Sequence, residues 1–99
     1  MIQAQIFIDK DELKGIKPLY EFILLFLLER NIAGATAFVG IMGFGKHQKL
    51  KRPNSGFSFD ETPLVITFID EEEKVKNALT ELRNQYSGGF IITQAVEQW

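Results

Sequence analysis

Cysteine is absent from the 99-residue sequence, and histidine occurs only once, as His47. Without cysteine the chain can form no disulfide, thiolate nucleophile or cysteine-ligated metal site, which is typical of a reducing compartment. A single histidine cannot build a metal cage or a catalytic triad within one chain, and none of the three serines has a basic residue beside it. The spacing of Asp9, Asp11 and Glu12 supports no acid/base pair. We therefore expect a protein that is not an enzyme.

A strong excess of charge of one sign is also missing. The formal net charge is −2 at pH 7, which argues against a protein that coats nucleic acid or an anionic membrane. The first residues lack the basic start and apolar run of a signal peptide, so we expect a cytoplasmic protein. Residues 19–28 are apolar except for Glu21, but a membrane span needs about 20 such residues. This run predicts a core helix, and the chain is not expected to be membrane-embedded.

Periodic hydrophobic patterns fill most of the remaining sequence. Alternating apolar residues and runs of β-branched and aromatic residues predict strands, and apolar residues at helical spacing predict helices. Asp70 and Glu73 have the spacing of a capping box, which predicts that the second helix starts at Glu71. The expected elements are strand 2–8, polar loop 9–17, helix 18–31, strand 35–41, strand 64–69, helix 71–86 and strand 90–96.

This order of elements, β-α-β-β-α-β, predicts an α+β fold of the ferredoxin-like class. Right-handed crossovers would place both helices on one face of a four-stranded antiparallel sheet. The hydrophobic content of 45% and the short chain support one core, and so a single domain over residues 1–99.

The strand at 64–69 is apolar on both faces, unlike a strand with one side in water. Val65 and Ile69 point one way, whereas Leu64, Ile66 and Phe68 point the other. The strand at 90–96 repeats this pattern. Scattered surface hydrophobes would be the simpler explanation, but two such strands favour an oligomer in which sister copies cover the open face.

The segment between the middle strands, residues 42–63, is long for a hairpin connection and is therefore a functional candidate. Four of the 11 basic residues fall between Lys46 and Arg52. Residues 48–52 and 56–60 could pair as a protruding hairpin with a mobile tip. The alternative is a solvated loop, and four cations on an acidic chain make nucleic-acid binding a poor prediction.

Gly40, Gly45 and Lys46 have the spacing of a phosphate-binding loop. The match fails at His47, which stands where a hydroxyl would bind magnesium, and a lysine-rich loop follows instead of a helix. A looser anion-binding nest at Gly43 to Lys46 is compatible with the glycines. We predict an anion site here, but not a P-loop.

Several motifs resemble those of a family of small uncharacterised PII-like proteins, and they cover nearly the whole chain. The resemblance implies a ferredoxin-like homotrimer akin to nitrogen-regulatory PII proteins. It also implies that the long loop contacts a membrane channel, transporter or enzyme, and that a nucleotide binds near residues 43–46 between subunits. The motifs are Lys17-Pro18-Leu19-Tyr20, Ala33-Gly34-Ala35-Thr36, residues 40–45 with His47, Thr62-Pro63-Leu64-Val65 and residues 70–74.

The chain departs from the PII pattern in the other half of that cleft. PII proteins carry basic residues there, whereas residues 84–99 of this chain contain no lysine or arginine. A triphosphate would find little compensating charge there, so an adenine nucleotide is one candidate effector among small anions. We expect a regulatory protein with this ligand-binding set: Gly43, Phe44, Gly45, Lys46, His47, Lys49 and Arg52. The alternative is a metal- or anion-tolerance protein of the same fold, using His47 and nearby carboxylates across subunits.

Overall fold

The structure is a computed structural model that describes residues 1–45 and 62–99. Two helices and four long strands follow the predicted order, and a short hairpin is added between the first strand and the first helix. The elements are β1 (Ile2–Asp9), β2 (Leu13–Lys14), β3 (Lys17–Pro18), α1 (Leu19–Glu29), β4 (Ala35–Val39), β5 (Pro63–Asp70), α2 (Glu72–Gln85) and β6 (Phe90–Ala95).

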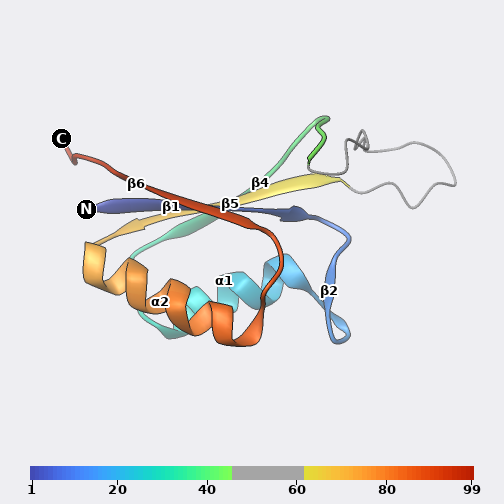
Figure 1. Cartoon of the computed structure of the whole chain (residues 1–99), viewed down its shortest axis with the longest axis horizontal. Helices are drawn as coiled ribbons and strands as arrows, with labels where there is room; N and C mark the ends of the chain where they lie inside the picture. The colour runs from blue at the N-terminus through green and yellow to red at the C-terminus, as the bar shows by residue number, and fades with distance from the viewer. Residues whose placement is uncertain (46–61) are drawn as a thin grey trace, which may run out of the picture.

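The four long strands form one antiparallel sheet in the order β4-β5-β1-β6. Both helices lie on the same face of this sheet (Figure 1). In the register, Ile6 of β1 lies between Ile66 of β5 and Ile91 of β6. The ferredoxin-like fold predicted from the sequence is confirmed.

The core lies between the helices and the alternate residues of β1 and β5. Ile6 and Ile66 are fully buried at the centre of the sheet, and Ile23 of α1 and Leu82 of α2 close over this layer with no exposed surface. Each such side chain contributes roughly 1.5–3 kcal/mol through burial. Within residues 1–45 and 62–99, no helix covers the opposite face of the sheet (Figure 1).

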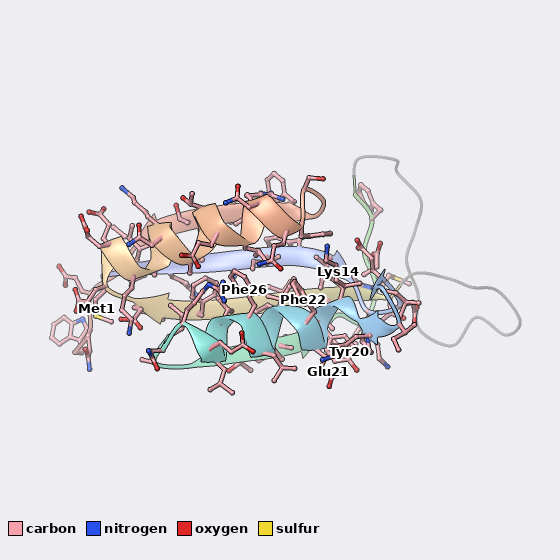
Figure 2. The ribbon with its side chains drawn as sticks, turned by 90° about the horizontal axis from the view of Figure 1, so that it is seen from below. Met1, Lys14, Tyr20, Glu21, Phe22 and Phe26 are labelled. Carbon is pink, nitrogen blue, oxygen red and sulfur yellow. The ribbon has the colours of Figure 1, made fainter. Side chains whose placement is uncertain are left out.

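The connection at 9–17 was predicted as a plain polar loop, but it contains the β2–β3 hairpin. Gly15 has a φ of 68°, so glycine supplies the left-handed conformation that the tight turn requires. Lys14 holds the hairpin against the helices, because its ammonium lies 5.7 Å from the Phe22 ring centroid (Figure 2) and donates to the carbonyl oxygen of Gln85. Strands of two residues are too short to produce a period in the sequence.

The predicted capping box is wrong. Helix α2 begins at Glu72, and its N-cap residue Glu71 makes no side-chain capping bond. The Asp70 carboxylate instead accepts the N–H of Ala33 at 2.9 Å and the N–H of Glu71 at 2.7 Å, and it pairs with Lys74 at 3.3 Å. Asp70 is buried at the end of β5 and therefore ties this corner to the α1–β4 connection. The bond from the Ala33 N–H contributes most to lowering the Asp70 pKa below its ordinary value.

Candidate functional site

The open face is the side of the sheet away from the helices, and one strand register along it is entirely apolar. Phe38, Val65, Phe7 and Phe90 are neighbours from β4 to β6, and we call these four residues the apolar row. The rings of Phe7 and Phe90 lie 5.9 Å apart between centroids. Phe38 is 57% exposed and Phe90 is 64% exposed, so the row is an uncovered hydrophobic surface.

The rest of the open face combines uncharged polar side chains with two further exposed apolar residues, Ile69 and Ile92. Gln94 donates to the Gln3 side-chain oxygen at 2.9 Å, and Gln3 donates to the Thr67 hydroxyl at 2.9 Å. Because these amides partner one another, covering them leaves few polar groups unpaired. Apolar side chains beside paired amides suit contact with another protein surface.

A hollow of about 1080 Å³ lies at the end of the sheet that carries the apolar row. Its volume is slightly above the roughly 300–1,000 Å³ of typical small-ligand sites. Strand ends, the segment after β4 and the start of β6 all contribute to it. The hollow is lined by Phe7, Ile8, Asp9, Glu12, Gly40, Met42, Gly43, Phe44, Gly45, Pro63, Leu64, Val65, Gly89 and Phe90.

Residues 40–45 form one wall of the hollow and follow directly from β4. The Gly40 N–H donates to the Pro63 carbonyl oxygen at 2.7 Å, which fixes where this wall leaves the sheet. Glycines at 43 and 45 leave the backbone accessible, and Phe44 exposes 70% of its surface. The wall therefore offers side-chain-free backbone and one aromatic ring to a ligand.

The predicted site residues divide into two groups. Gly43, Phe44 and Gly45 lie together in the hollow. The other four predicted ligand-binding residues, and the predicted hairpin at 48–60, lie outside the described residues. These four are Lys46, His47, Lys49 and Arg52.

The acidic side of the hollow was not predicted from the sequence, where Asp9 and Glu12 suggested only solvated charge and turn chemistry. Glu12 Oε2 accepts the Tyr86 O–H at 2.9 Å. Burial is the main cause that raises the Tyr86 pKa above its ordinary value, and the bond to Glu12 adds to the effect. No sequence signal links these two residues, because 74 positions separate them.

The turn after α2 forms the remaining wall, at Gly89 and Phe90. The Arg83 guanidinium donates to the Gly88 carbonyl oxygen at 2.6 Å and to the Tyr86 carbonyl oxygen at 3.3 Å. Gly89 has a φ of 69°, and a Cβ there would lie 3.1 Å from Ile8 Cγ2. The wall is therefore held rigidly, and Arg83 is committed to the backbone of the turn.

Metal ligands do not gather in the part of the chain that the structure describes. No group of three or more His, Cys, Asp or Glu residues there is arranged to hold an ion. Over the same residues, no helix is long and apolar enough to cross a membrane.

Comparison with known sequences finds relatives over nearly the whole chain. The family model described as "DUF190: Uncharacterized ACR" matches residues 1–98. Two proteins of Aquifex aeolicus (strain VF5), both named "UPF0166 protein", are similar to the chain. One is 36% identical over 94% of this chain and 88% of its own length, and the other is 33% identical over 74% and 76%.

Comparison with solved structures finds the same fold in two kinds of protein. CPII, a nitrogen regulatory PII-like protein from Thiomonas intermedia K12 bound to ADP, AMP and bicarbonate, matches with a TM-score of 0.68. The match is 18% identical and covers 94% of this chain and 82% of CPII. The divalent ion tolerance protein CutA1 from Ehrlichia chaffeensis matches with a TM-score of 0.66 and 18% identity, covering 99% of this chain and 82% of CutA1.

Proposed function

This chain belongs to the uncharacterised DUF190 family, and from that premise we propose that it is a PII-like regulatory protein that binds a small anionic effector in the hollow. The resemblance to uncharacterised PII-like proteins inferred from the sequence is confirmed by the family and by the fold. The proposal treats the chain as a cytoplasmic binding protein that is not an enzyme.

The hollow is the observation that carries this proposal. Exposed rings at Phe7, Phe44 and Phe90 provide apolar surface for a flat ligand. Gly43 and Gly45 carry no side chain, so an anionic group can approach their backbone closely. CPII, which has the same fold, is bound to ADP, AMP and bicarbonate, and this supports adenine nucleotides and small anions as the first ligands to test.

The charge of the hollow favours an effector with few phosphates. Its described lining contains Asp9 and Glu12 but no lysine, arginine or histidine. In the proposal, Lys46, His47, Lys49 and Arg52 supply the positive charge, since the rest of the lining offers none. A nucleoside monophosphate is therefore preferred over a triphosphate.

The proposed assembly is a homotrimer whose copies cover each other's open faces. The apolar row and the uncharged amides beside it support this arrangement. Residues 42–63 would then remain available to a target, such as a membrane transporter or an enzyme. Effector binding at the base of this segment would change its conformation and so its affinity for the target.

Calorimetric titration of the full chain with AMP, ADP, ATP and bicarbonate tests the proposal. We expect AMP or ADP to bind more tightly than ATP, and Phe44→Ala to weaken binding by removing a ring from the hollow. Leu28→Ala is the matched control, because Leu28 is an exposed side chain on α1 outside the hollow. The proposal fails if two results occur together. These are that none of the four ligands binds, and that a variant lacking residues 48–60 still captures every partner that the full chain captures.

The CutA1 likeness favours a second candidate, a divalent-ion tolerance protein. In this alternative, His47 and nearby carboxylates from several copies bind the metal. Calorimetric titration with Cu²⁺ or Zn²⁺ would then give heat at a fixed stoichiometry that His47→Ala abolishes.

A further inference from the structure

Helix α1 is apolar around nearly its whole circumference, although the fold buries only one side of it. Its buried residues are Leu19, Ile23, Phe26 and Leu27. A helix on the surface of a globular protein ordinarily carries polar side chains opposite its buried side. On α1 that opposite side carries Leu25 and Leu28, which are 39% and 68% exposed, with the half-buried Leu24 beside them. We call Leu24, Leu25 and Leu28 the leucine face.

The leucine face lies on the flank of α1 that is turned away from α2. Figure 2 shows Phe22 and Phe26 directed toward α2, whereas Glu21 lies on the other flank. The three leucines follow Glu21 by three, four and seven residues, so they share its side of the helix. The leucine face is therefore separate from the helix–helix contact and from the open face of the sheet.

Negative charge borders the leucine face. The charged residues of α1 are both carboxylates, Glu21 and Glu29, and both are exposed. Along residues 18–45 the one basic residue is Arg30. Its guanidinium pairs with Glu81 of α2, so it is committed within the fold. The helix thus presents exposed leucines together with two carboxylates that α1 itself does not neutralise.

We infer that the leucine face docks a basic amphipathic helix of a target protein. Leucines three and four residues apart form ridges against which the apolar side of a second helix packs at about 8–10 Å between axes. Lysine or arginine residues beside that apolar side would meet Glu21 and Glu29. The inference goes beyond effector binding, because none of the leucine face lines the hollow. Failure of either idea leaves the other standing.

The two carboxylates argue against two other occupants of the leucine face. An anionic membrane surface would be repelled by Glu21 and Glu29, whereas it attracts basic segments. A second copy docked through the same face would form a two-fold contact, in which identical surfaces meet. Such a contact would bring the carboxylates of one copy toward those of the other, which is unfavourable. A basic partner satisfies both the leucines and the charge.

Fluorescence anisotropy of dye-labelled peptides, titrated with the full chain at about 0.15 M salt, tests the inference. The first peptide contains leucine and lysine, with its leucines on one helical face. The second has the same composition in scrambled order, and the third has the pattern of the first with glutamate in place of lysine. We expect the first peptide to bind about tenfold more tightly than either of the others. Its circular dichroism should become helical on binding.

Two pairs of variants locate the binding of the leucine–lysine peptide. Leu28→Ala should weaken it about tenfold, because the most exposed leucine is lost. Ile16→Ala is its control, since Ile16 is a fully exposed aliphatic residue on the β2–β3 hairpin. Glu21→Lys should weaken binding of this peptide about fivefold and strengthen binding of the glutamate peptide. Glu97→Lys makes the same charge change at an exposed position after β6 and should alter neither affinity.

Three results would overturn the inference. One is that the leucine–lysine peptide fails to bind, or binds no more tightly than its scrambled form, since charge alone would then explain any attraction. Another is that Leu28→Ala and Ile16→Ala bind this peptide equally. The third is that Leu28→Ala instead abolishes binding to phosphatidylglycerol vesicles or splits an assembly of two trimers, because the occupant would then be a membrane or a second copy.

Discussion

Gly40 and Pro63 are in direct contact where the long segment leaves and re-enters the sheet. The Gly40 N–H donates to the Pro63 carbonyl oxygen at 2.7 Å, and a Cβ at Gly40 would lie 2.9 Å from Pro63 Cγ. A proline ring cannot rotate away as a flexible side chain would. Position 40 therefore excludes any side chain, and its contact with Pro63 sets the geometry of the wall at residues 40–45.

Gly40→Ala should destabilise the chain by about 1–3 kcal/mol, because the methyl group overpacks against the Pro63 ring. The melting temperature should fall by roughly 4–8 °C for each kcal/mol in a domain of this size. Gly34→Ala is the control, since nothing lies within 4 Å of a Cβ at that position. Equal melting temperatures for the two variants would contradict the contact described above.

Asp70 should make stability depend on pH in the acid range. Its bonds from the Ala33 and Glu71 N–H groups and its pairing with Lys74 hold the pKa below the ordinary value of 3.8. A carboxyl group whose pKa is lower in the folded chain stabilises the fold at any pH above its pKa in the unfolded chain. This stabilisation is lost as the pH falls through the pKa of the group in the folded chain. In urea unfolding between pH 7 and pH 2, the free energy of unfolding should therefore fall more steeply with decreasing pH for the wild type than for Asp70→Asn.

The same variant should already be less stable at pH 7, by about 1–3 kcal/mol, because the charged acceptor is lost. Glu72→Gln serves as the comparison. It removes a carboxylate whose pair with Lys76 is solvent-exposed, and such pairs contribute at most about 1 kcal/mol. Parallel pH curves for the wild type and Asp70→Asn would contradict the role given to Asp70.

Phe38→Glu should dissociate the proposed trimer, because it buries a charge in the apolar row of the open face. Sedimentation velocity should then report single chains, with the fold retained by circular dichroism. Leu28→Glu provides a matched control. Leu28 is 68% exposed, compared with 57% for Phe38, but it lies on α1 and away from the open face. Dissociation by both variants, or by neither, would argue against the open face as the interface.

The fold could be predicted because its signals are local. Alternation along residues 2–8 and the double-sided pattern of residues 64–69 located the two central strands, and residues 90–96 located an edge strand within one residue of its observed end. The β2–β3 hairpin left no comparable period. The Asp70 prediction failed because its carboxylate meets the distant Ala33 N–H, a tertiary contact that the local motif does not contain.

The candidate site was predictable only in part, because its walls come from distant parts of the chain. The glycines at 43 and 45 form a visible motif, and the structure places them on one wall of the hollow. Glu12 acquires its orientation from Tyr86, which is brought beside it only by folding. The place of Gly89 on the wall depends on the pairing of β1 with β6, which no local pattern shows.

Native mass spectrometry of the full chain, with and without added AMP, tests the central claim most directly. The account predicts a three-chain mass that increases in steps of one AMP, up to one per chain. A single-chain mass that AMP does not change would contradict it.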